Sequence, residues 1–138
     1  MKAQRGLENT VVIFFSDTGP TKLGSTAGLR GTKGNGFEGG IRVPCIIRYP
    51  KKIAAGSVSD QPFLSMDLTA SILSLADAIP SQPLDGIDLI ETLAATDLKP
   101  EVENRPLFWR KRRGDVTVKA MRQESWKLVV QHNGDQTD

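Results

Sequence analysis

Two side chains carry the clearest chemical signal in the sequence, and the first of them is Asp17. It follows a run of β-branched and aromatic residues, 10–15, and precedes Gly19 and Pro20. A carboxylate where a strand meets a turn can bind a hard divalent cation, which prefers oxygen ligands, although it can equally cap the turn. Calcium takes about six to eight oxygens, so the other ligands of such a site must come from elsewhere.

The second side chain is Lys33, which lies in a glycine-rich segment. Eight of the 13 glycines fall from Gly19 to Gly40. Glycine permits positive φ angles and a close approach of the backbone to a ligand, so Lys33 can present its ammonium group to an anion. The order of a Walker A loop is absent, and so is a dinucleotide-binding glycine pattern between a strand and a helix. The alternative is a solvated loop lysine.

Other polar residues have structural explanations. Glu38 and Arg42 flank a glycine pair and are expected to form an ion pair that braces the loop. Asp85 and Asp88 resemble an acid–base pair, but the turn residues around them favour a turn and a helix N-cap. Cys45 lies in an apolar run and is expected to be a small buried hydrophobe.

A basic cluster at residues 110–113 could indicate a nucleic acid or another polyanion as partner. It ends at Gly114 and Asp115, which signal a turn, so a solvated hairpin end is the favoured interpretation. The net charge of +2 gives no support for a broad basic face.

Composition narrows the function classes further. The chain has 138 residues, 18 Lys+Arg against 16 Asp+Glu, and 38% apolar residues, which suits one globular domain. Cys45 alone cannot form an internal disulfide framework, and His132 alone excludes a mechanism that needs two imidazoles of this chain. No apolar run approaches the length of a membrane span. We therefore expect neither a nucleic acid nor a membrane as partner.

Hydrophobic patterning predicts an α/β architecture. The run 10–15 suits a strand of a parallel sheet that is buried on both faces, and residues 41–49 suit a second strand that begins near Pro44. Residues 65–78 predict a helix with Ser65 as its N-cap. Its expected apolar stripe consists of Leu68, Ile72, Leu75 and Ile79, and Pro80 ends it.

The last third of the chain changes character. A short helix is expected to run from the turn at residues 84–88 to about Ala95, followed by a polar linker, 96–104. Strands are expected at 106–109, 116–122 and 126–130, with Glu124 in the turn before the last one. The sequence thus predicts a first domain at residues 1–104 and a small antiparallel subdomain at 105–138.

Taken together, these motifs resemble the sulfatase family. Residues 9–17 resemble its strand and metal-binding turn, and residues 29–44 its active-site lysine loop. Residues 65–69, 84–89 and several positions from Arg105 to Leu128 are also sulfatase-like. The ordered set covers the chain from about Asn9 to Val130.

The resemblance implies an alkaline-phosphatase-like α/β fold with a small antiparallel C-terminal sheet, and hydrolysis of sulfate esters at a bound cation, usually calcium. It implies that Asp17 is a calcium ligand and that Lys33 is both substrate-binding and catalytic, stabilising negative charge on the sulfate in the transition state. The family's metal turn reads Asp-Asn-Gly, whereas Thr18 stands in place of the Asn here. A hydroxyl is a poorer calcium ligand than an amide carbonyl, so the contact of Thr18 with the metal is the weaker expectation.

A second departure concerns the nucleophile, which the family makes as a formylglycine in a C/S-x-P-x-R motif. This sequence has no such motif. We therefore expect the chain to be the C-terminal part of a sulfatase and to be inactive alone. Its expected partners are a sulfate ester as substrate of the complete enzyme and either an N-terminal sulfatase portion or a second copy of the chain. Full-length relatives are commonly exported, periplasmic or lysosomal.

Two alternatives remain. One is a degenerate, non-catalytic paralogue that acts as a binding module, and the other is a phosphoester or phosphonate hydrolase of the same superfamily.

Overall fold

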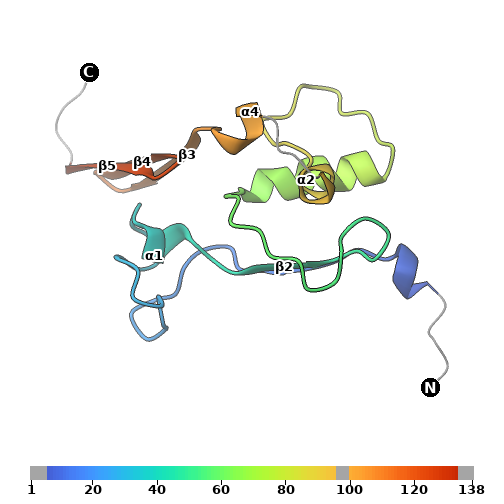
Figure 1. The fold of residues 1–138 in the computed structure, drawn as a ribbon. Coiled ribbons are helices and arrows are strands. Elements are labelled where there is room, and N and C mark those ends of the chain that lie inside the picture. The colour runs from blue at the N-terminus through green and yellow to red at the C-terminus, as the bar shows by residue number, and fades with distance from the viewer. Residues whose placement is uncertain (1–5, 96–99, 134–138) are drawn as a thin grey trace. The chain divides into compact units, whose positions relative to one another are not determined.

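A computed structural model describes residues 6–95 and 100–133 (Figure 1). The elements are, in order, the 3-10 helix η1 (Leu7–Asn9), β1 (Val12–Phe15), α1 (Glu38–Ile41), β2 (Cys45–Arg48), α2 (Ser65–Leu75), α3 (Leu89–Ala94), α4 (Pro100–Glu103), β3 (Leu107–Arg113), β4 (Val116–Gln123) and β5 (Trp126–Asn133). Within the described residues, no helix is long and apolar enough to cross a bilayer.

The chain divides into two compact units. The helix unit comprises Met1–Phe14 and Ile46–Lys99, and the loop–sheet unit comprises Phe15–Cys45 and Pro100–Asp138. Each unit therefore combines an early and a late part of the sequence. The domain boundary after residue 104 remains a prediction.

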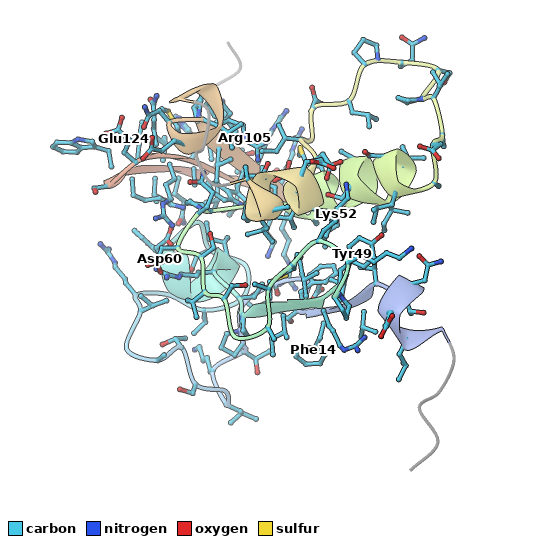
Figure 2. The ribbon with its side chains drawn as sticks, turned by 45° about the vertical axis from the view of Figure 1, so that its right-hand side comes forward. Phe14, Tyr49, Lys52, Asp60, Arg105 and Glu124 are labelled. Atoms are coloured by element: carbon cyan, nitrogen blue, oxygen red, sulfur yellow. The ribbon has the colours of Figure 1, made fainter. Side chains whose placement is uncertain are left out.

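The core of the helix unit lies between α2 and α3. Leu68 on α2 and Leu89 and Ile90 on α3 are buried. Asp88 caps α3 as expected, because its Oδ1 accepts hydrogen bonds from the backbone N–H groups of Ile90 and Glu91, at 2.9 and 3.0 Å. A surface ion pair joins Lys52, labelled in Figure 2, to Glu91.

Helix α2 differs from the prediction at both ends. Leu64, not Ser65, occupies the N-cap position, and its N–H donates to Oδ2 of Asp67 at 2.7 Å. The helix ends at Leu75, before Asp77 adopts a φ of 51°. Ile79 therefore lies outside the helix and is 96% exposed, and Ile72 is 55% exposed. Of the four residues of the expected apolar stripe, Leu68 alone is buried.

Strands β1 and β2 pair with each other but are not buried on both faces. Phe14, labelled in Figure 2, is 66% exposed, and Ile46 is 63% exposed. Cys45 is likewise exposed, which corrects the prediction of a buried hydrophobe. Burial on both faces needs a layer of helices or another sheet packed on each face, and the exposed side chains of β1 and β2 have no such cover among the described residues. Pro44 directly precedes β2, as expected.

The region expected to be a polar linker is in part helical. Helix α4 occupies Pro100–Glu103, and residues 96–99 of the expected linker lie outside the described part of the chain.

In the loop–sheet unit, β3, β4 and β5 form the expected antiparallel sheet in sequence order. The turn between β4 and β5 contains Glu124, which Figure 2 labels. The basic residues 110–113 lie within β3 rather than at a hairpin end, because the strand continues to the turn at Gly114. Residues at alternate positions share one face of the sheet. The face that meets the glycine-rich loop, called the loop-facing side below, comprises Leu107, Trp109, Lys111, Arg113, Val116, Val118, Ala120, Arg122, Lys127, Val129 and Gln131.

Candidate active-site residues

The structure brings Asp17 and Lys33 together. Asp17 lies two residues beyond the end of β1, and Nζ of Lys33 is 3.4 Å from its Oδ2. The two side chains are 79% and 47% exposed, respectively. A charged pair this open to water contributes about 1 kcal/mol or less to stability, so both groups can exchange this contact for a ligand at small cost.

Close backbone contacts hold Lys33 in this position. Its N–H donates to the carbonyl of Pro20 at 2.8 Å, and the N–H of Gly19 donates to the carbonyl of Gly40 at 3.0 Å. A side chain at Gly19 would overlap the carbonyl group of Gly39. The glycine-rich segment therefore folds tightly back onto the turn that carries Asp17, and Gly19 cannot be replaced without moving the backbone.

Glu38 anchors the same loop to the sheet. Its carboxylate accepts from Nη1 of Arg122 at 3.2 Å and from Nζ of Lys127 at 3.1 Å. The expected pair of Glu38 with Arg42 is therefore wrong, because two partly buried cations of the sheet occupy the carboxylate. No local sequence pattern could have indicated partners that lie so far along the chain.

Lys127 has a second partner in the sheet. Its ammonium lies 4.1 Å from the centroid of the Trp109 ring, a cation–π geometry. Burial lowers the pKa of Lys127, and the hydrogen bond that Lys127 donates to Glu38 opposes that shift. A desolvated ammonium held by both a carboxylate and an aromatic ring has a structural role.

Metal-binding capacity is partial. Thr18 donates its hydroxyl to the carbonyl of Gly19 at 3.1 Å, which leaves oxygen lone pairs but no charge for a cation. Over residues 6–95 and 100–133, no three His, Cys, Asp or Glu residues cluster as metal ligands. Asp17 can act as one hard oxygen ligand. Asp17 and Thr18 together provide fewer than the roughly six oxygens that calcium takes.

Three comparisons with known proteins give the family. A model of the sulfatase family matches residues 1–78. The chain belongs to the sulfatase family. It is 40% identical over 110 residues to N-acetylgalactosamine-6-sulfatase of Mus musculus, covering 74% of this chain and 20% of that protein. It is 39% identical over 100 residues to arylsulfatase A of Homo sapiens, with 68% and 20% covered.

A solved structure extends this similarity to the fold. The crystal structure of Ps i-CgsB in complex with k-i-k-neocarrahexaose matches with a TM-score of 0.78 and 26% identity, over 96% of this chain and 32% of that one. The α/β fold with its small antiparallel sheet is thus the alkaline-phosphatase-like fold of sulfatases, as expected. The chain spans about a fifth of the length of the curated relatives that it matches.

Proposed function

We propose that this chain contributes the C-terminal part of a sulfatase active site. In a complete enzyme Asp17 supplies one ligand of a calcium ion, and Lys33 binds the sulfate ester and stabilises the negative charge that develops on it. The observation that carries the proposal is the 3.4 Å contact between Nζ of Lys33 and Oδ2 of Asp17, both open to solvent.

The Asp17–Lys33 pair can bind ligands as well as neutralise its own two charges. A cation bound at Asp17 would compete with Lys33 for the carboxylate, because both carry positive charge. The ammonium released in this way is then free to bind an anion placed beside the metal. Calcium, when bound, supplies Lewis-acid stabilisation of a sulfate oxygen. Lys33 adds an ammonium donor, and the hydrogen bond from its backbone N–H to the carbonyl of Pro20 fixes the position of its backbone.

The isolated chain is expected to be inactive. Sulfatases need an activated nucleophile, and the C/S-x-P-x-R motif from which the family makes formylglycine is absent from residues 1–138. We propose that an N-terminal sulfatase portion supplies the nucleophile and the remaining metal ligands.

Activity measurements test whether this chain and an N-terminal portion supply different parts of the active site. The purified chain should leave an aryl sulfate intact in excess calcium. Joined to an upstream coding segment that carries C/S-x-P-x-R, it should hydrolyse the ester. Lys33→Ala should then lower kcat/KM by about 100-fold, whereas Lys119→Ala should leave it unchanged. Hydrolysis by the isolated chain that Asp17→Ala abolishes would overturn the proposal, and so would full activity of the joined Lys33→Ala enzyme.

Thr18 favours a second candidate, a non-catalytic binding module. Its hydroxyl donates to Gly19 where the family has an amide ligand, which weakens the cation site. This candidate predicts that the joined protein binds sulfate esters but does not hydrolyse them. A phosphoester or phosphonate hydrolase remains the third candidate, and it predicts that the joined enzyme prefers an aryl phosphate to the aryl sulfate.

A further inference from the structure

The sheet of the loop–sheet unit lies directly against the Lys33 loop. A methyl group added at Gly36 would lie 2.9 Å from Cβ of Ala120 and 3.2 Å from Cγ1 of Val118. Glu38, two residues further on, pairs with Arg122 and Lys127 on the same face of the sheet. An apolar contact and two ion pairs therefore set where the loop meets the loop-facing side.

This register places Lys111 beside Gly34, the residue that follows Lys33. Lys111 lies on β3 and pairs across the sheet with Val118, the residue that contacts Gly36. A methyl group added at Gly34 would touch Nζ of Lys111 and lie 3.8 Å from its Cε. The ammonium of Lys111 thus reaches the backbone of the residue that follows Lys33.

The charges around this contact do not balance. Among the described residues of the loop-facing side there is no acidic side chain. Glu38 already binds Arg122 and Lys127, and Asp17 binds Lys33. No ion pair of Lys111 occurs within the described residues, and its side chain is exposed. Lys33 has Asp17 as its partner, whereas Lys111 on β3 adds a positive charge beside the same loop that no described carboxylate pairs with. An anion bound there would neutralise this charge.

We propose that Lys111 is a second anion-binding residue of the Lys33 site and contacts an anionic oxygen of a sulfated substrate. The inference rests on the proposed function and adds to it that the C-terminal sheet takes part in substrate binding. A side chain at position 34 would displace the Lys111 ammonium, although the tip of a flexible lysine moves at little cost. The φ of +100° is the reason for glycine at position 34.

Binding of inorganic sulfate to the intact chain tests the proposal. Amide signals of residues 31–36 would be followed by NMR at constant ionic strength, with chloride as the balancing anion. Lys111→Ala should weaken sulfate binding about threefold, the effect of removing one exposed charge. The control is Lys119→Ala, which removes the same charge from the opposite face of the same sheet. It should change the affinity by much less.

The variants separate this inference from the proposed function. If Lys33→Ala weakens sulfate binding but Lys111→Ala behaves as Lys119→Ala does, the role of Lys111 is wrong and that of Lys33 stands. If neither Lys33→Ala nor Lys111→Ala has an effect, both are wrong. Lys111→Arg keeps the charge and should retain most of the affinity. Loss of binding in Lys111→Arg equal to that in Lys111→Ala, with the fold intact by amide chemical shifts, would also overturn the inference.

Discussion

Two aspartates of this chain, Asp67 and Asp17, show how differently one side chain can be used. Asp67 is fully buried, and its oxygens accept hydrogen bonds from the N–H groups of Leu64, at 2.7 Å, and Ile87, at 2.9 Å. Asp17 is 79% exposed, and its ion pair with Lys33 is 3.4 Å long. Asp67 lies in the first turn of α2, and Asp17 follows the end of β1.

The difference lies in what would be lost if each carboxylate changed partner. Asp67 holds the start of α2 to the segment before α3, and Ser71 continues this link by accepting from the N–H of Leu89 at 2.8 Å. Removal of a buried acceptor leaves its donors without partners, which is costly. Asp17 can leave Lys33 for a cation with little loss. A buried carboxylate with all its hydrogen bonds made thus stabilises the fold, whereas an exposed, weakly paired carboxylate remains available for a ligand.

The largest expected change in stability comes from removing the buried Asp67 rather than the exposed Asp17. Asp67→Ala should lower the free energy of unfolding by about 3 kcal/mol, because two partly buried N–H groups lose their fully buried acceptor. Asp17→Ala should change it by about 0.5 kcal/mol or less. Urea unfolding followed by circular dichroism measures both. Equal changes in the free energy of unfolding for the two substitutions would contradict the distinction between a structural and an available aspartate.

Glu38 lies between these extremes and sharpens the comparison. Its carboxylate is 25% exposed and bonds two cations of the sheet. Glu38→Gln should destabilise the chain by about 1–2 kcal/mol, less than a fully buried pair would because water screens the charges. The amide signals of residues 31–36 should shift as the loop loosens on the sheet. Glu124→Gln, in the exposed turn, is the control and should do neither.

The smallest expected change in stability comes from Glu124, whose side chain does not suit its backbone conformation. Glu124 adopts a φ of 50° in the turn between β4 and β5. Asn tolerates this conformation better than Glu, so Glu124→Asn should raise the free energy of unfolding by about 0.5 kcal/mol. Thermal unfolding would detect the change, and a lower midpoint would show that the Glu124 side chain makes a stabilising contact.

Sequence signals predicted local features well. Asp88 as an N-cap, Pro44 just before a strand and the turn at Glu124 depend on neighbours within a few residues, and each is confirmed. The resemblance to sulfatases implies that Asp17 and Lys33 serve one active site, and the structure brings the two side chains within 3.4 Å of each other. Their roles in binding calcium and sulfate stay predictions.

Features that depend on distant partners escaped prediction. The partners of Glu38 lie 84 and 89 residues away, and no local pattern distinguishes them from Arg42. Helix α1 contains two glycines, which have low helix propensity, so its single turn depends on the packing of the loop. The exposure of Phe14 depends on what packs on the face of its sheet, which its own segment does not encode.

The central claim is that Asp17 and Lys33 form an open pair that a cation and an anion can separate. Sulfate titration of the chain joined to an upstream segment that supplies the remaining metal ligands, with and without excess calcium and followed at the signals of Lys33, tests it most directly. By linkage, calcium at Asp17 should tighten sulfate binding at Lys33 about two- to fivefold. Asp17→Ala should abolish the dependence on calcium. The same sulfate affinity with and without calcium in the unaltered chain would contradict the claim.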